Sequence, residues 1–161
     1  MTIRRMEEKD IDAVTMIFNY YIENTNCNWQ REGRPRAFYA DWLVTHDDAH
    51  PAYVLEEAGE VIGFASLSTF RGVNGYDKIL ENTIYVMPGH QGKGYGAQLM
   101  QTLIDAGKRM GLWAVTAWID SDNASSIAFH KKYGFYEVGV MNNIGNKGER
   151  RLSVSILQLN L

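Results

Sequence analysis

Apolar residues recur along the chain with two different periods, which predicts a mixture of helices and strands. The spacing typical of one helix face occurs over residues 10–23, 37–44, 99–110 and 123–133. Shorter β-type runs occupy residues 2–6, 52–56, 61–68, 79–86, 113–119, 135–140 and 152–159. This order predicts an α/β fold, in which a helix crosses over between the strands ending at Val86 and Ile119.

Turn residues support these element boundaries. The segment 58–60 separates two β-type runs and predicts a hairpin, and Gly111 follows the third helical segment as a C-terminal cap. The chain has three prolines and no Pro-, Ser- or Gly-rich tract that would mark a linker. We therefore expect one domain spanning residues 1–161.

Composition and charge narrow the class of protein. The chain has 161 residues, 45% of them hydrophobic and 22% charged, which is typical of a globular domain that needs no disulfide to fold. Its net charge of −3 argues against general binding of nucleic acids or anionic membranes. Cys27 is the single cysteine, so the sequence predicts neither a disulfide framework nor a cysteine-based zinc site, and we expect no metal.

The sequence also suggests a cellular location. The first residues contain no apolar segment of signal-peptide length, and no apolar run approaches the ~20 residues of a membrane helix. We therefore expect a cytoplasmic protein in which Cys27 stays reduced.

The clearest candidate chemistry lies in a glycine-rich segment after the strand predicted over 79–86. It reads His90-Gln91-Gly92-Lys93-Gly94-Tyr95-Gly96-Ala97. Glycines permit close approach of the backbone to a ligand, and the N-terminus of the following helix offers unpaired N–H groups. A phosphate or pyrophosphate site is the favoured interpretation, and a tight turn without a ligand is the alternative.

Two well-known phosphate-binding loops fit this segment poorly. A P-loop fails because Gly92-Lys93 is followed by Gly94 and because Met87 stands five positions before Gly92. A dinucleotide-binding loop matches 92–97, and Asp120 stands near the position of a ribose-binding acid. However, five residues separate the strand from the first glycine, and no second βαβ unit follows. A nicotinamide-dependent enzyme therefore stays open as a weaker alternative.

Two segments resemble the GCN5-related N-acetyltransferase (GNAT) superfamily. Gln91-x-x-Gly94-x-Gly96 is similar to the family's acetyl-CoA pyrophosphate loop, and residues 123–135 resemble its N-x-x-(A/S)-x-x-hydrophobic-(Y/H)-x-x-x-G-F run. The order of elements fits over nearly the whole chain. The resemblance implies a central, mixed, mostly antiparallel twisted sheet of about seven strands flanked by about four helices. It also implies that the strands ending near Val86 and Ile119 splay apart.

Within the family, the chain resembles most the acetyltransferases of phosphinothricin and of methionine sulfone or sulfoximine. The similarity rests on residues 19–22, Trp29, Phe70-Arg71, 81–86, His130 and 158–161. It implies a homodimer that transfers acetyl from acetyl-CoA directly to the α-amino group of a small amino acid or analogue, in a ternary complex. Two alternatives stay open: a GNAT enzyme acting on peptide, protein or polyamine amines, and a non-catalytic CoA-binding module.

The resemblance also implies which residues hold acetyl-CoA. Main-chain groups of the strand 79–86 would bind the pantetheine arm, and the N–H of Val86 or Met87 would stabilise the oxyanion. Asn123 would bind the arm, cap the following helix, or do both. The expected cofactor-binding residues are Ile84, Tyr85, Val86, Met87, Gln91, Gly92, Lys93, Gly94, Tyr95, Gly96, Ala97, Asn123 and His130.

The chemistry requires a base, because amines are mostly protonated at neutral pH. Glu81 is the expected base; it shares a strand face with Thr83 and Tyr85, and burial would raise its pKa. The resemblance implies that His130 donates a proton to the leaving thiolate, although the residue could instead only pack on the cofactor. Tyr85 is grouped with these two as a catalytic candidate.

Recognition of the acceptor, the substrate that carries the amine, is assigned by resemblance to the loop before Glu81. The expected substrate-binding residues are Phe70, Arg71, Tyr76, Lys78 and Glu81, with Arg71 suited to pair a carboxylate. The chain departs from better-known members at Asp77-Lys78 and at Ser153, where several members have aspartate. Trp29 and Trp42 are either pocket walls or core residues.

Overall fold

The computed structural model describes residues 1–161, and its central element is a seven-stranded sheet of order β1-β2-β3-β4-β5-β7-β6. The strands are β1 (Thr2–Arg5), β2 (Ala52–Glu57), β3 (Glu60–Thr69), β4 (Ile79–Val86), β5 (Ala114–Asp120), β6 (Tyr136–Lys147) and β7 (Arg150–Asn160). The helices are α1 (Ile11–Asn24), α2 (Arg36–Val44), α3 (Tyr95–Arg109) and α4 (Ala124–Lys132), with 3₁₀ turns at Glu8–Asp10 and Asn74–Tyr76.

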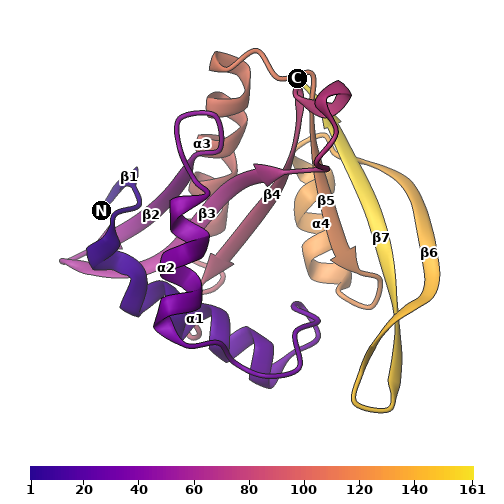
Figure 1. Ribbon diagram of the computed structural model, residues 1–161, viewed down its shortest axis with the longest axis horizontal. Helices are drawn as coiled ribbons and strands as arrows, with labels where there is room; N and C mark the ends of the chain where they lie inside the picture. The colour runs from indigo at the N-terminus through magenta and orange to yellow at the C-terminus, as the bar shows by residue number, and fades with distance from the viewer.

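The sheet opens between β4 and β5, as Figure 1 shows. These two strands are the only parallel neighbours, and they pair only where Ile79, Leu80 and Glu81 face the first residues of β5. Beyond Glu81 each strand continues without pairing to the other. The α3 helix supplies the crossover that a parallel pair needs. The predicted mixed sheet, its four helices and its splay are thereby confirmed.

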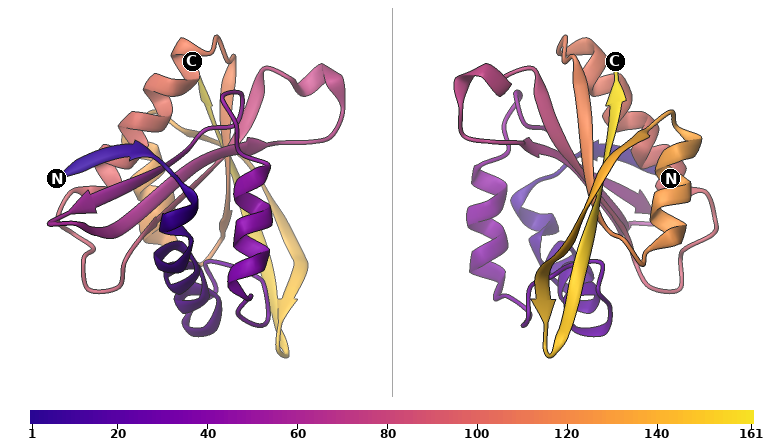
Figure 2. Two further views of the ribbon diagram at one scale, coloured as in Figure 1. Left: turned by 60° about the vertical axis from the view of Figure 1, so that its left-hand side comes forward. Right: turned by 90° about the vertical axis from the view of Figure 1, so that its right-hand side faces the viewer.

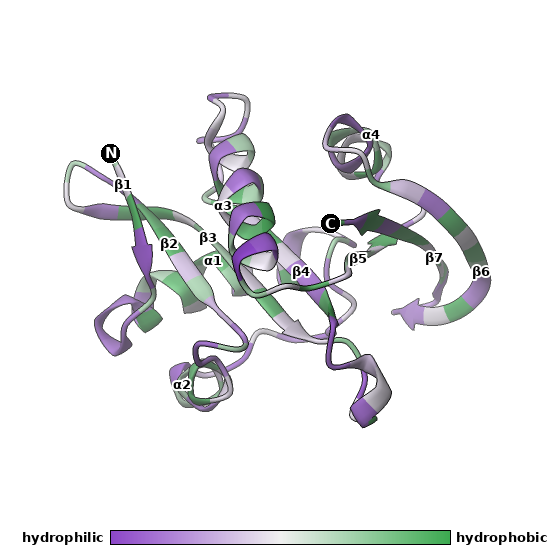
Figure 3. Cartoon of the chain, turned by 90° about the horizontal axis from the view of Figure 1, so that it is seen from above, coloured by the Kyte–Doolittle hydropathy of each residue, from purple (hydrophilic) through white to green (hydrophobic).

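Helices cover both faces of the sheet. The α1 and α2 helices lie on one face, and α3 and α4 lie on the other (Figure 2). The α3 helix buries Leu99, Met100, Leu103 and Ile104 against the sheet, and its hydrophilic residues lie on other sides (Figure 3). None of the four helices combines the length and hydropathy that crossing a bilayer requires.

The last hairpin is longer than its sequence pattern predicts. The expected strand 135–140 runs in the structure from Tyr136 to Lys147, and its partner starts at Arg150. Register shifts between Glu137 and Gly139 and between Met141 and Gly145 insert extra residues, which destroys the period-two pattern. In the second bulge Asn143 has a left-handed φ of 54°, and its N–H donates to Ser153 Oγ at 3.0 Å.

Candidate active site

A cavity of about 1330 Å³ opens where β4 and β5 separate. Its walls come from β4, the glycine-rich loop, the start of α3, the end of β5 and α4. The loop between α1 and α2 (residues 25–35) and Ile144 of β6 complete it. A concave site with converging polar groups is the usual form of a small-molecule site.

Main-chain groups of β4 point into this opening. The N–H of Met87 donates to the Ile62 carbonyl of β3 at 2.8 Å. Because alternate residues of a strand bond to opposite sides, the main-chain groups of Ile84 and Val86 face away from β3. The Val86 carbonyl accepts from the Tyr21 hydroxyl at 2.7 Å. The expectation that Met87 could supply the oxyanion donor is therefore wrong, because its N–H is bound to β3; the N–H of Val86 faces the gap.

The glycine-rich loop is built for an anion. Gly92 and Gly94 adopt left-handed φ angles of 78° and 84°, and a β-carbon at either position would meet nothing within 4 Å. Conformation, not space, therefore requires glycine there. Gly94 caps α3, no side chain caps this terminus, and the first helical bond runs from Gln98 N–H to the Gly94 carbonyl. The N–H groups of residues 95–97 are left for a ligand such as a pyrophosphate.

Gln91 braces this loop. Its Oε1 accepts from the Gly89 N–H at 2.8 Å, and its Nε2 donates to the Tyr21 hydroxyl at 2.8 Å. Since Tyr21 in turn donates to the Val86 carbonyl, one chain of hydrogen bonds joins the loop, α1 and the open end of β4. The Gln91 side chain therefore helps to fix the conformation of the glycine-rich loop.

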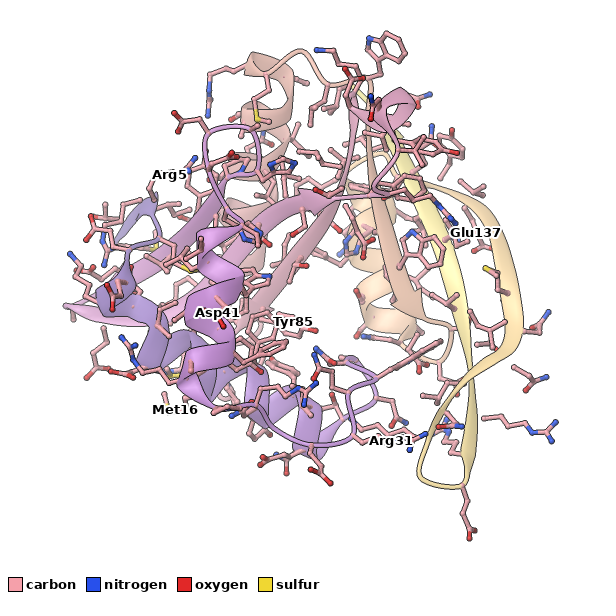
Figure 4. All side chains as sticks on the ribbon, in the orientation of Figure 1. Arg5, Met16, Arg31, Asp41, Tyr85 and Glu137 are labelled. Carbon is pink, nitrogen blue, oxygen red and sulfur yellow. The ribbon has the colours of Figure 1, made fainter.

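Glu81 and Tyr85 share the face of β4 that is turned toward α1 and α2. Glu81 is half-buried and makes no hydrogen bond or ion pair, and burial raises the pKa of its carboxyl. Tyr85 packs on Phe18 and Tyr21 with ring centroids 5.2 and 5.0 Å apart, and Figure 4 shows it beside α1. Burial also raises the pKa of the Tyr85 hydroxyl, so the phenol stays protonated.

His130 is buried on the opposite face, with both ring nitrogens bonded. Its Nδ1 lies 2.8 Å from the Ser126 carbonyl, which accepts only, so Nδ1 carries the proton. Its Nε2 then accepts from Asn82 Nδ2 at 3.1 Å. Burial lowers the pKa of His130, so the neutral ring is favoured. In this arrangement Nε2 has no proton to give to a thiolate, and the ring positions Asn82.

Asn123 has the capping role that its position predicts, because its Oδ1 accepts from the Ser126 N–H at 3.1 Å. Tyr95 turns its hydroxyl away to Glu57 Oε2 at 2.8 Å, so toward the loop it offers its main chain. Met87 and Lys93 do not line the cavity. The other predicted cofactor residues do: Ile84, Tyr85, Val86, Gln91, Gly92, Gly94, Tyr95, Gly96, Ala97, Asn123 and His130.

The predicted acceptor residues do not gather around Glu81. Arg71, Tyr76 and Lys78 line a second cavity of about 620 Å³. The Lys78 carbonyl accepts from the Trp113 N–H at 2.8 Å, which holds the end of this loop against the start of β5. Phe70 packs between the two cavities, 5.3 Å from the Tyr76 ring centroid and 6.4 Å from that of Trp118. Among the residues lining the main cavity there is no arginine.

One end of the main cavity is lined by Asn28, Trp29, Trp118 and Ile144, two of them aromatic. We name it the acceptor end, after the substrate that the sequence predicts. Trp29 Nε1 donates to Oδ2 of the buried Asp120 at 3.0 Å. Trp42, the other candidate wall, packs in the core against Phe18 and Phe64. Sequence reasoning missed Asn82 and Trp118; the available signal for Asn82 was a polar residue on a strand face that otherwise carries Leu80, Ile84 and Val86.

No cluster of His, Cys, Asp and Glu side chains has the arrangement of a metal site. His46 and His50 are four residues apart but follow α2 in an irregular segment. Each ring is bonded to protein groups; His46, for example, lies 2.8 Å from the Trp42 carbonyl and 3.0 Å from Ser68 Oγ.

Comparisons with known proteins find relatives that match over nearly the whole chain. The acetyltransferase (GNAT) family model matches residues 14–135. The chain is 36% identical to the L-methionine sulfoximine/L-methionine sulfone acetyltransferase of Salmonella typhimurium, over 100% of this chain and 95% of that protein.

Two solved structures have nearly the same fold. The ribosomal-protein-alanine N-acetyltransferase from Brucella melitensis superposes with a TM-score of 0.97, at 32% identity over 100% of both chains. The phosphinothricin acetyltransferase from Sinorhizobium meliloti, solved in complex with acetyl-CoA, gives a TM-score of 0.94 at 30% identity, over 99% of this chain and 88% of that one.

Proposed function

Because the chain belongs to the acetyltransferase (GNAT) family, we propose that it transfers acetyl from acetyl-CoA to the α-amino group of a small amino acid or amino-acid analogue. The observation that carries this proposal is the position of Glu81. It is a half-buried carboxylate without a partner, and it lines the same cavity as the glycine-rich loop and the open edge of β4.

The residues of the cavity fit acetyl-CoA. Unpaired N–H groups at the start of α3 suit a pyrophosphate, and the gap-facing main chain of Ile84 and Val86 suits the amides of a pantetheine arm. When bound, acetyl-CoA supplies an acetyl group activated as a thioester. The Val86 N–H, which faces the gap, would stabilise negative charge that develops on the acyl oxygen.

Glu81 would accept the proton of the acceptor's ammonium group. Its carboxylate is free of other partners, and its raised pKa makes it a stronger base than an exposed glutamate. Tyr85, four residues further along the same strand face, stays protonated and can donate a hydrogen bond. His130 would act mainly through Asn82, which it holds at the edge of the cavity.

A small acceptor is supported by how the acceptor end is enclosed. The α1–α2 loop and the β6–β7 hairpin meet over it, as Figure 4 shows at Arg31, whose Nη2 donates to Asn146 Oδ1 at 2.6 Å. A peptide chain would need an open groove there. A protein or peptide acceptor is the second candidate, since one neighbour of this fold is named for a ribosomal-protein alanine.

We further propose a cytoplasmic homodimer. Support for the dimer comes from β6, an edge strand with exposed apolar side chains at Tyr136, Val138, Val140 and Met141. Support for the location comes from the exposed free thiol of Cys27, which fits a reducing compartment. Sedimentation equilibrium tests the dimer, and Val138→Lys should shift it toward monomer.

The proposed activity is tested by release of CoA thiol from acetyl-CoA with a panel of acceptors: L-methionine sulfone, L-methionine sulfoximine, L-phosphinothricin, a polyamine and a lysine peptide. We expect release with the three amino acids and a large loss of kcat in Glu81→Gln. Release only with the peptide or polyamine would refute the acceptor class. Acetyl-CoA binding without release, unchanged by Glu81→Gln, would favour a non-catalytic CoA-binding module.

A further inference from the structure

Lys147, at the end of β6, holds the loop that covers the acceptor end. Its ammonium donates to three main-chain carbonyls, those of Ile22, Thr25 and Asn28, the last two at 2.7 and 2.8 Å. It forms no ion pair. All three protons of the ammonium are therefore used on residues that end α1 or follow it.

These carbonyls are a favourable site for a cation. The Ile22 carbonyl lies in the last turn of α1, where the helix dipole is negative, and α1 has no basic residue of its own in that turn. Lys147 supplies the missing charge from a strand more than 100 positions later. Without it, partly buried carbonyls would lack a partner.

The two residues before Lys147 contact the same loop. A β-carbon at Gly145 would lie 2.5 Å from Cε3 of Trp29, so only glycine leaves room for the indole. Asn146 accepts from Arg31. On its other side the indole is fixed by its bond to Asp120, at the end of β5. Three consecutive hairpin residues thus hold one loop at three points.

The bulge in β6 is what brings these residues into reach. Between Met141 and Gly145 the strand gains two residues relative to β7, and Asn143 takes its left-handed conformation there. The Ser153 hydroxyl satisfies the Asn143 N–H. Figure 2 shows the hairpin extending past the sheet toward the end of α1.

We propose that Gly145, Asn146 and Lys147 form a clamp that fixes Trp29 as the wall of the acceptor end and so determines which acceptors react. The clamp rests on the proposed function. A rigid indole wall limits the length and width of the acceptor's side chain and excludes bulky aromatic ones. These three residues are positioning residues, since they act through Trp29 and the loop.

The first test removes the charge. In Lys147→Met we expect KM for L-methionine sulfone to rise about tenfold or more, while KM for acetyl-CoA stays within about twofold. Lys147→Arg keeps the charge and should lose less. Tryptic cleavage after Arg31, which lies in the clamped loop, should accelerate in Lys147→Met; Lys9→Met, at an exposed ion pair, is the control.

The second test changes the position or the size of the side chain at residue 29. Gly145→Ala should raise the acceptor KM, whereas Gly139→Ala on the same strand, where a β-carbon meets nothing within 4 Å, should not. Trp29→Ala should shift the ratio of kcat/KM for L-phenylalanine over L-methionine sulfone upward by about tenfold or more.

Unchanged acceptor KM and unchanged cleavage in Lys147→Met would overturn the clamp. Equal rises in both Michaelis constants would also overturn it, because they would indicate a disturbance of the whole cavity rather than of the acceptor end. If the wild-type enzyme acetylates no amino acid, the proposed function fails. The cleavage rates of Lys147→Met and Lys147→Arg then still decide whether the clamp exists.

Discussion

Removing the hydroxyl of Tyr21 should weaken acetyl-CoA binding, because this hydroxyl links the glycine-rich loop to the open end of β4. In the structure it accepts from Gln91 Nε2 and donates to the Val86 carbonyl. Tyr21→Phe keeps the ring and its packing on Tyr85, with centroids 5.0 Å apart. The variant therefore isolates the two hydrogen bonds.

The magnitude follows from those two bonds. Each is worth about 0.5–1.5 kcal/mol net, so unfolding should become easier by ~1–3 kcal/mol. For a chain of this length the midpoint Tm falls by about 2–4 °C per kcal/mol. If half of the lost energy affects the glycine-rich loop, KM for acetyl-CoA should rise about 2- to 13-fold. The acceptor KM should stay within about twofold, because the acceptor end contains neither bond.

Steady-state kinetics with each substrate varied in turn, together with thermal melts, decide this prediction. Tyr20→Phe is the matched control, since Tyr20 is exposed and its hydroxyl makes no hydrogen bond. A double-mutant cycle with Gln91→Ala should show coupling of about 0.5 kcal/mol or more. An unchanged KM for acetyl-CoA in Tyr21→Phe, with zero coupling to Gln91, would refute the role given to these two hydrogen bonds in acetyl-CoA binding.

Four further predictions concern the site. Glu81→Gln should lower kcat by about 10²- to 10⁴-fold and raise Tm at pH 8. The raised folded pKa means that stability is lost as pH rises through the unfolded pKa toward the folded one, and glutamine escapes that loss; a lower Tm would contradict it. For the same reason the acid limb of kcat/KM should lie above the ordinary pKa of a glutamate, which a pH–rate profile measures. Asn82→Asp should raise the pKa of His130, because a carboxylate beside Nε2 favours the charged ring. Histidine NMR measures this pKa, and an unchanged value would contradict the prediction. Gly94→Ala should cost about 1–2 kcal/mol at its left-handed φ and weaken acetyl-CoA binding in calorimetry, with Gly139→Ala as the unaffected control.

The sequence brought together most of the cavity-lining residues that we propose for acetyl-CoA, because this half of the candidate site is local. The strand, glycine-rich loop and helix that form it are consecutive, over residues 79–109. Gly92 and Gly94 both adopt the left-handed backbone conformation that a glycine in a tight loop indicates. Glu81 and Tyr85 were placed on one face by period two alone. Lys93 is different: the motif contains it, but nothing in a motif says whether a loop side chain points into the cavity.

The longer hairpin could not be predicted, for a physical reason. Two bulges shift its register, and each shift moves side chains to the other face. The position of Arg71 relative to Glu81 could not be predicted either. Its loop is near Glu81 in sequence, but the Lys78 carbonyl ties that loop to the start of β5, and Arg71 then lines the second cavity.

The acceptor half of the candidate site therefore depends on contacts between residues that are distant in the sequence. Its wall, Trp29, is fixed by Asp120 and fitted against Gly145, so its position depends on residues about 90 and 115 positions away in the sequence. Such contacts leave no local pattern in the sequence. A glycine that leaves room for a distant side chain cannot be told, from sequence alone, from a glycine that forms a turn. Relatives that share the glycine-rich loop can thus share acetyl-CoA and still differ in acceptor. Substitutions at Gly145, Asn146 and Lys147 should change which amine reacts while leaving the use of acetyl-CoA intact, and this separation is what the split between the two Michaelis constants measures.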